Sequence, residues 1–298
     1  MKIDALRTDD ARFDHLPDWP YRPKYVDDLP GYQGLRMHFV DEGPDDAEVF
    51  LCLHGEPTWS YLYRRMIPVF LEANARVVAP DLYGFGRSDK PVDDSVYTWD
   101  FHRRSLVEFV EALDLSDVTL VVQDWGGLLG LTLPVDMAER IKGLLIMNTG
   151  LGIGVAPSEG FVAWRDYVAN TPDLAVGKLI ARGTPHLTEA EIAAYDAPFP
   201  GPEYKAGVRR FPAIVPTDPD MDGVEVSKAA ARWWSEQFEG RSFMAIGMAD
   251  PVLGAPVMHS MHRMIKGCPE PMEIPDGGHF VQEWGEPIAR AALDAWGT

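Results

Sequence analysis

The sequence predicts an α/β fold in which a mostly parallel β-sheet carries helices on both faces and a helical segment interrupts the chain. Two observations predict this architecture. Short apolar runs alternate with amphipathic stretches through the first half of the 298 residues, and the alternation stops after Asn148 and resumes near residue 226. We therefore expect an α/β core domain at residues 1–150 and 221–298 and a helical cap at residues 151–220.

The expected strands are short apolar runs bounded by turn-forming residues. They lie at residues 35–40, 49–53, 76–79, 118–122, 143–147, 242–247 and 272–274. Helices are expected at residues 61–72, 99–113, 126–137, 226–238 and 287–296. Strands that alternate with helices in this way pair in parallel through crossover connections.

The segment 151–220 has a different pattern. It is rich in Pro and Gly, shows no strand pattern, and contains three short helical patterns at residues 161–169, 173–181 and 189–195. An insertion at the carboxyl edge of a parallel sheet lies over the crevice in which such folds bind ligands. We therefore expect this segment to cover the functional site.

Composition narrows the choice of partners. Hydrophobic residues make up 46% of the chain, enough for a large buried core, and 46 acidic against 27 basic residues give a formal net charge of −19. A surface of this charge repels phosphate backbones and anionic lipids, so we expect no nucleic-acid partner and no membrane partner. A neutral small molecule is not disfavoured.

The cysteines and the N-terminal residues indicate a cytoplasmic protein. Cys52 and Cys268 are too few for a disulfide framework, and their spacing does not suggest a metal site. The first residues carry acids early and lack the apolar core of a signal peptide. No run approaches the ~18 apolar residues of a membrane span.

The segment VTLVVQDWGG at residues 118–127 places Asp124 at a tight turn between an expected strand and an expected helix. This is the context of a nucleophile elbow, in which the apex side chain is exposed at the top of the sheet. Gly126 and Gly127 permit the turn. The apex residue is usually Ser, and Val122 takes the place of the first Gly in the usual G-x-S-x-G pattern.

An aspartate at the apex changes the chemistry. A carboxylate at a helix N-terminus stays ionised, needs no base to activate it, and can attack a carbon that carries a leaving group. The product is an alkyl ester, so the pattern favours opening of a carbon–halogen bond or an epoxide. Taken alone, Asp124 is equally consistent with the N-cap of an ordinary helix.

Three further motifs supply partners for Asp124. HGEP at residues 54–57 follows a strand and offers the backbone N–H of Glu56, which together with that of Trp125 is placed to form an oxyanion hole. DGGHF at residues 276–280 puts His279 on a loop, and GMAD at residues 247–250 ends a strand with Asp250. A histidine on a glycine-rich loop is more often structural. The chain order of nucleophile, acid and base nevertheless matches catalytic elbows of this type.

The motifs HGEP, VVQDWGG, GMAD and DGGHF together resemble those of the haloalkane dehalogenases, a family of α/β hydrolases. The resemblance covers nearly the whole chain, including residues 160–164, 187–191 and 197–200 of the expected cap. It implies the α/β-hydrolase fold with an eight-stranded sheet. It is closest to the branch that acts on small chlorinated alkanes such as 1,2-dichloroethane. A second branch takes its acid from the position of Asn148, so the resemblance assigns the acid to Asp250.

The resemblance implies hydrolysis of carbon–halogen bonds in bacterial detoxification. Asp124 would displace the halide and become esterified, while the indoles of Trp125 and Trp164 would hold the departing ion. Without the resemblance, core packing is the better interpretation of both indoles. The implied partners are a small neutral haloalkane, a halide ion and water, with no metal and no cofactor. We expect a monomer.

The second half of the implied reaction is hydrolysis of the ester. His279 would activate the attacking water, and Asp250 would stabilise the imidazolium that forms. The carboxyl group of Glu56 would help to position that water.

Four apolar residues are expected to line the substrate pocket, although each is also consistent with plain core packing: Phe161, Leu128, Val252 and Leu253. Relatives in the closest branch carry Phe where this chain has Leu128, and the linker 151–157 is shorter than theirs. Both differences affect the expected size of the substrate and leave the expected reaction type unchanged.

Three alternatives remain. Epoxide hydrolases share the Asp nucleophile but use cap tyrosines, and Tyr167, Tyr195 and Tyr204 lie in the expected cap. Fluoroacetate-type dehalogenases place Arg after the nucleophile, where this chain has Trp125. A non-catalytic binding protein of the same fold typically loses the nucleophile or the histidine, and both are present here.

Overall fold

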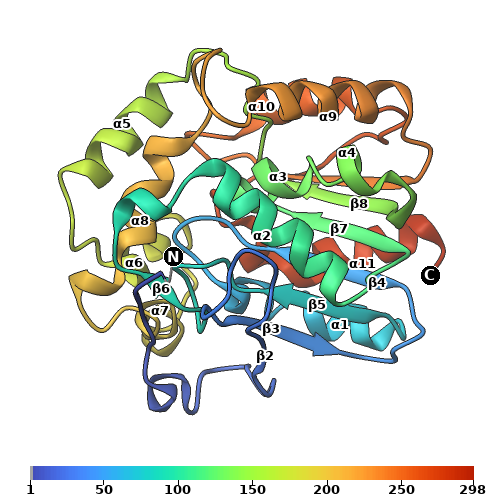
Figure 1. Ribbon diagram of the computed structural model, residues 1–298. Coiled ribbons are helices and arrows are strands. Elements are labelled where there is room, and N and C mark those ends of the chain that lie inside the picture. The colour runs from blue at the N-terminus through green and yellow to red at the C-terminus, as the bar shows by residue number, and fades with distance from the viewer. Residues whose placement is uncertain (1–2) are drawn as a thin grey trace.

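The computed structural model describes residues 3–298, and its centre is an eight-stranded β-sheet (Figure 1). The spatial order is β10-β9-β8-β7-β4-β5-β3-β2. All pairs from β10 to β5 are parallel, and β3 is antiparallel to both β5 and β2. The bounds are β2 Lys24–Val26, β3 Met37–Glu42, β4 Val49–Leu53, β5 Arg76–Pro80, β7 Val118–Val122, β8 Ile141–Met147, β9 Arg241–Gly247 and β10 Met272–Ile274.

All seven strands expected from the sequence are present, with bounds that differ by at most two residues. The expectation missed β2 at the sheet edge and a separate antiparallel pair, β1 (Ala5–Leu6) with β6 (Lys90–Pro91). These strands have two or three residues each and form only because distant segments pair with them. A run that short carries no periodic signal in the sequence.

Alternate side chains of the central strands enter two separate cores. Phe50 and Cys52 of β4 pack with the apolar side chains of α1 and α11, whereas Leu51 and Leu53 pack with those of α2. Helices therefore cover both faces, as the strand period of two requires. The bounds are α1 Ile67–Glu72, α2 Trp99–Ala112, α9 Val224–Glu236, α10 Ala255–Met264 and α11 Gly285–Trp296.

Two expected helices are each split in the structure. The helix expected at 61–72 is the 3₁₀ helix η2 (Ser60–Tyr63) followed by α1, and the helix expected at 126–137 is α3 (Asp124–Gly130) followed by α4 (Pro134–Met137). Pro68 and Pro134 lie in the first turn of α1 and α4. Proline is tolerated there but interrupts a helix interior, so each marks a new helix start.

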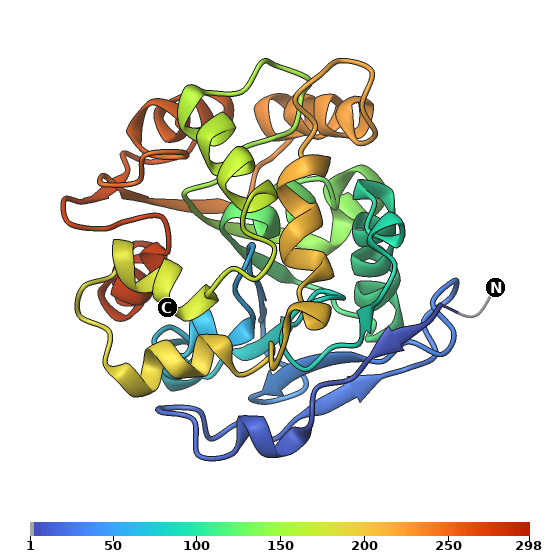
Figure 2. The same cartoon turned by 90° about the vertical axis from the view of Figure 1, so that its left-hand side faces the viewer.

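Between β8 and β9 the described chain contains helices and no strand up to residue 240. The segment 151–220 holds α5 Glu159–Ala169, α6 Val176–Gly183, α7 Glu189–Asp196, η5 Pro202–Tyr204, α8 Ala206–Arg210 and η6 Phe211–Ile214. Figure 1 shows these helices beside the carboxyl ends of the parallel strands, and Figure 2 shows them in front of the sheet. The remaining 3₁₀ helices are η1 Asp10–Phe13, η3 Asp94–Val96, η4 Ala138–Arg140 and η7 Val281–Trp284.

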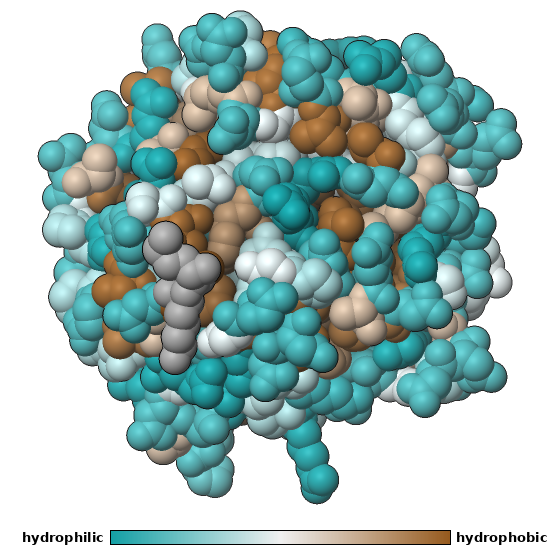
Figure 3. Space-filling view, in the orientation of Figure 1, coloured by the Kyte–Doolittle hydropathy of each residue, from teal (hydrophilic) through white to brown (hydrophobic). Residues whose placement is uncertain are grey.

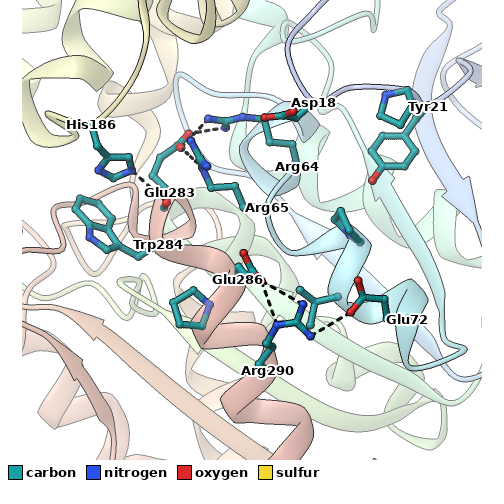
Figure 4. Close-up of a pocket in the computed structure, with 14 residues that line it drawn as sticks. Asp18, Tyr21, Arg64, Arg65, Glu72, His186, Glu283, Trp284, Glu286 and Arg290 are labelled. Carbon is teal, nitrogen blue, oxygen red and sulfur yellow. Dashed lines mark hydrogen bonds and ion pairs between the residues drawn. The ribbon is translucent and has the colours of Figure 1, made fainter.

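A buried ion cluster joins α7 to the core, and Figure 4 shows its members Arg64, Arg65 and Glu283. The guanidinium of Arg64 donates to both carboxylate oxygens of Glu283 at 2.6 and 2.7 Å and to Glu191 of α7 at 2.8 Å. Arg65 donates to the same two carboxylates, and the hydroxyl of Tyr195 donates to Glu283. Glu283 lies in η7, only four residues after His279, so the cluster links the histidine loop to the helical segment.

The face shown in Figure 3 is largely hydrophilic, and its apolar side chains form separate patches. This agrees with the acidic composition. Within residues 3–298, every helix is too short or too polar to cross a bilayer.

Candidate active site

Asp124 stands at the sharp turn between β7 and α3. Gln123 is still extended, whereas Asp124 has a φ of +48°, a left-handed conformation that non-glycine residues adopt at a free-energy penalty. The backbone N–H of Asp124 donates to the carbonyl of Asn148 at 3.0 Å. A side chain at Gly126 would collide with the carbonyl of Leu53, so glycine is required for this close approach. The elbow predicted from the sequence is therefore present.

The carboxylate of Asp124 is held between two other loops. The backbone N–H of Glu56 donates to Oδ1 at 2.7 Å, and Oδ2 lies 3.5 Å from Nε2 of His279. A Cβ at Gly55 would collide with the same carboxylate, which explains a glycine before Glu56. Among the described residues, the Trp125 backbone N–H forms no hydrogen bond to Asp124. That half of the expected oxyanion hole stays a prediction.

His279 and Asp250 form the expected pair. Nδ1 of the imidazole lies 2.8 Å from Oδ2 of Asp250. The backbone N–H groups of Val252 and Leu253 donate to Oδ1 at 2.8 and 3.1 Å, and Asn148 donates to Oδ2 at 2.9 Å. Burial alone would raise the pKa of Asp250, but these donors and the imidazole lower it to about 2. Asp250 is therefore ionised at neutral pH.

The imidazole of His279 faces two carboxylates. Burial alone would lower its pKa, but Asp250 and Asp124 outweigh burial and hold the pKa well above its usual value. The contribution of Asp124 depends on its negative charge. Any reaction that neutralises Asp124 therefore lowers the pKa of His279.

The side chain of Glu56 is a third carboxyl group in the site. It is 4% exposed, and Oε1 has no hydrogen-bond partner among residues 3–298. Burial, with a smaller effect of the Asp124 charge, raises the pKa of Glu56 well above its usual value. Burial therefore favours the protonated form of this carboxyl group, which faces the cavity described next.

A cavity of about 410 Å³ lies over Asp124, between the core and the helical segment. Trp125 and Trp164 both line it, together with Asp124, Glu56 and His279. Trp125 is almost fully buried and packs against Phe211 of η6, with ring centroids 4.5 Å apart. Neither of the two indole N–H groups has a protein acceptor within residues 3–298. In a cavity, such unpaired donors are suited to an anion or a polar ligand atom.

All four expected pocket residues line this cavity: Leu128, Phe161, Val252 and Leu253. Sequence reasoning missed the apolar residues Ile153, Val155, Leu179, Val215 and Pro216, which also line it. They come from the linker before α5, from α6 and from the stretch after η6. No motif marks these positions, because only the way the segment folds back over the core brings them to the site.

The three tyrosines considered for an epoxide hydrolase lie elsewhere. Tyr195 is fully buried with its hydroxyl on Glu283, and Tyr167 is exposed on α5. Neither of these, nor Tyr204, is among the described residues that line the cavity. The cavity therefore lacks the phenol donors that such an enzyme uses.

Two residues have contacts that the sequence did not reveal. In the sequence, Asn148 indicated only that the catalytic acid lies elsewhere. In the structure its side chain donates a hydrogen bond to Asp250 and forms hydrogen bonds with the backbone N–H and C=O of Gly247. Gln123 was part of the elbow motif without a role, and its amide contacts His279. For Gln123 the available signal was its position directly before Asp124, and for Asn148 it was a polar residue directly after a buried strand.

Comparisons with known proteins agree with this geometry. The family model described as "alpha/beta hydrolase fold" matches residues 48–286. The haloalkane dehalogenase of Psychrobacter cryohalolentis is 43% identical over 97% of this chain and 96% of its own length. Haloalkane dehalogenase 1 of Mycobacterium bovis is 45% identical over 94% of both chains.

Solved structures agree as well. The haloalkane dehalogenase DpaA of Paraglaciecola agarilytica superposes with a TM-score of 0.97 at 54% identity, over 98% of this chain and 99% of that one. DatA of Agrobacterium tumefaciens gives a TM-score of 0.74 at 27% identity, over 92% and 96%. DpaA is described as tetrameric, so the expected monomeric state of this chain stays a prediction. The fold, the site and these relatives together place the chain in the haloalkane dehalogenase family of the α/β hydrolases.

Proposed function

We propose that this protein hydrolyses the carbon–halogen bond of small neutral haloalkanes, converting a haloalkane and water into an alcohol, a halide ion and a proton. One observation carries the proposal. The carboxylate of Asp124 lies at a strained elbow, under an apolar cavity, with one oxygen on the Glu56 N–H and the other facing His279.

In the first step Asp124 attacks the carbon that carries the halogen. The Oδ2–carbon bond forms as the carbon–halogen bond breaks, and the halide leaves with the bonding electrons. The indole N–H groups of Trp125 and Trp164 stabilise the charge that develops on the halogen. A donor in a site that excludes water is more effective here than bulk solvent.

In the second step the alkyl ester is hydrolysed. His279 accepts a proton from a water molecule while the water oxygen attacks the carbonyl carbon of Asp124. The Glu56 N–H stabilises the oxyanion, and Asp250 stabilises the imidazolium. The carboxyl group of Glu56, whose protonated form is favoured by burial, is suited to hold the attacking water. As the tetrahedral intermediate collapses, the bond between the carbonyl carbon and the alkyl oxygen breaks, and the imidazolium of His279 gives its proton to the leaving alkoxide to form the alcohol. Asp124 then loses the proton of its new hydroxyl to solvent, which restores the carboxylate.

The cavity supports substrates larger than two carbons. Its volume of about 410 Å³ lies within the range of pockets that hold ligands of moderate size. Leu128, in place of a larger aromatic residue, adds room above Asp124. We propose a substrate range that includes 1,2-dichloroethane-type compounds and extends to four-carbon chains.

A halide-release panel tests this function. The protein is incubated with 1,2-dichloroethane, 1,2-dibromoethane, 1-bromobutane and styrene oxide, while halide, proton and diol are followed. We expect halide and proton in equal amounts from the bromoalkanes. Diol from styrene oxide without halide from any haloalkane would instead indicate an epoxide hydrolase.

The covalent route has a separate test in the variant His279→Phe. Because attack by Asp124 needs no base, the alkyl ester should form and persist when the base is absent. We expect a mass increase on the peptide that contains Asp124 after treatment with 1-bromobutane. No adduct, in a folded protein that still binds bromide, would contradict the covalent route.

We further propose that residues 151–220 act as a cap over the core of residues 1–150 and 221–298. The supporting observation is that both parts line one cavity. A monomeric state and a cytoplasmic location are retained as proposals. Size-exclusion chromatography with light scattering and cell fractionation test them.

A further inference from the structure

Gln123, the residue before Asp124, has no assigned role but contacts the imidazole of His279 directly. Its side chain is fully buried. Its amide nitrogen lies 3.0 Å from Nε2 of His279 and 3.0 Å from the backbone carbonyl oxygen of the same residue. This contact is shorter than the 3.5 Å between Nε2 and the carboxylate of Asp124.

The surroundings fix which end of the Gln123 amide faces the imidazole. The carbonyl oxygen of His279 can only accept a hydrogen bond, so the atom facing it must be the amide nitrogen. On the other side, Nε2 of Gln282 donates to Oε1 of Gln123 at 3.3 Å and to the hydroxyl of Tyr63 at 3.4 Å. If the Gln123 amide were reversed, its oxygen would face the carbonyl oxygen of His279, and its NH₂ group would face the NH₂ group of Gln282. The first contact would pair two acceptors and the second would pair two donors.

This orientation determines the form of the imidazole that fits. The amide of Gln123 presents an N–H to Nε2, so Nε2 accepts a hydrogen bond only when it carries no proton. The other ring nitrogen then carries the proton and donates to Asp250. A proton on Nε2 would place two donors 3.0 Å apart and would lose this hydrogen bond.

We propose that Gln123 is a positioning residue that opposes protonation of Nε2 of His279, so that more of the alkyl-enzyme carries a neutral imidazole when the ester is to be hydrolysed. The inference rests on the proposed function and adds a group that acts through His279. The charged or titratable groups that face this imidazole come from three other elements. Asp124 and Asp250 favour the protonated form, and Glu56 lies beyond Asp124.

Gln123 opposes the two carboxylates in the free enzyme. In the alkyl-enzyme the charge of Asp124 is gone, and the Gln123 amide and Asp250 remain as the direct partners of the ring. The amide then favours the neutral imidazole in the step that requires it, and it yields the Nε2 lone pair to the attacking water when the proton is transferred. Without the amide, more of the alkyl-enzyme would carry imidazolium, and hydrolysis of the ester would require a higher pH.

The first test measures protonation without turnover. Protein labelled with ¹⁵N-histidine is titrated by NMR, and the His279 signals are assigned by their loss in His279→Phe. In Gln123→Met, we expect the midpoint of Nε2 protonation to rise by about half to one pH unit, the size of one neutral hydrogen bond. In Gln123→Glu the rise should be larger, because a carboxylate accepts the Nε2 proton. The matched control is Gln237→Met on the exposed end of α9, which should leave the midpoint unchanged.

The second test separates the two chemical steps by rapid quench with 1-bromobutane. In Gln123→Met, the halide burst should keep the wild-type rate, whereas the acid limb of ester hydrolysis should move to higher pH by the NMR shift. Equal slowing of both steps at every pH, or an unchanged midpoint in either folded variant, would overturn the inference. If the wild type releases no halide, the proposed function fails, and the NMR midpoint still decides the role of Gln123.

Discussion

Replacing Asp250 by Asn tests how the acid controls the tautomer of the base. The two oxygens of Asp250 have different partners. Oδ1 accepts from the backbone of Val252 and Leu253, and Oδ2 accepts from Asn148 and faces Nδ1 of His279. In Asp250→Asn the amide oxygen must keep the backbone donors, so the new NH₂ group faces two other donors.

The magnitude follows from this conflict. The contact at 2.8 Å between position 250 and Nδ1 is relieved only when the ring proton moves to Nε2, the atom that should accept a proton from water. A catalytic histidine in the wrong tautomer loses about 10⁴-fold in rate, or about 5.5 kcal/mol of transition-state stabilisation. The first step should be nearly unaffected, because attack by Asp124 uses no base.

The assay is a rapid-quench experiment with 1-bromobutane. We expect one equivalent of bromide in a burst, followed by turnover that is lower by roughly 10³- to 10⁴-fold, with alkylated Asp124 visible by mass. Urea denaturation serves as the control for folding, with an expected loss of about 1–3 kcal/mol from the mismatched amide. A decrease of less than tenfold without accumulation of the ester would refute the reasoning about the tautomer.

Three further predictions concern the halide site and stability. Trp164→Phe should weaken bromide binding by about 1.5–3 kcal/mol, which is measured as weaker quenching of tryptophan fluorescence by bromide. The control Trp233→Phe, outside the cavity, should leave bromide binding unchanged. Equal quenching in both variants would contradict the halide role of Trp164. Glu283→Gln, in the buried ion cluster, should lower the free energy of unfolding measured in urea by about 3–5 kcal/mol. The control Glu286→Gln, in an exposed ion pair, should lower it by less than about 1 kcal/mol. Similar losses in both variants would show that the buried cluster does not stabilise the fold more than a surface ion pair. Burial alone would raise the pKa of Asp81, but neighbouring histidines and backbone N–H groups lower it to about 2. The pKa of Asp81 is lower in the folded than in the unfolded state. Asp81 therefore contributes about 2 kcal/mol to the free energy of unfolding above pH 4, and this contribution is lost as the pH falls toward 2. Asp81→Asn should flatten this part of the stability curve, and an unchanged slope would disprove the linkage.

The sequence was most informative where one local pattern determines one local structure. The short run at residues 118–122, rich in β-branched residues, predicts a buried strand, and the Gly-rich turn after it predicts the elbow at Asp124. Chain order then paired His279 with Asp250 across the sheet. These predictions needed no knowledge of how distant segments pack.

The sequence was least informative where distant segments decide the outcome. The edge strand Lys24–Val26 exists because β3 pairs with it. The role inferred for Gln123 depends on the carbonyl of His279, 156 residues away, which fixes the direction of the amide. The buried position of Arg64 likewise depends on carboxylates at residues 191 and 283. Periodicity and composition are local properties, so they contain no information about such contacts.

Halide release precedes ester hydrolysis because the three carboxyl groups around His279 differ in their hydrogen-bond partners and charges. Burial next to the charge of Asp124 raises the pKa of Glu56, whereas Asp250 is ionised because four donors surround it. Alkylation removes the charge of Asp124 and, with it, one of the two carboxylates that raise the pKa of His279. The halide-releasing step therefore shifts the histidine toward its neutral form, which is the form that can accept a proton in the next step. A neutral amide at Gln123 strengthens this change, whereas a fourth carboxylate there would oppose it.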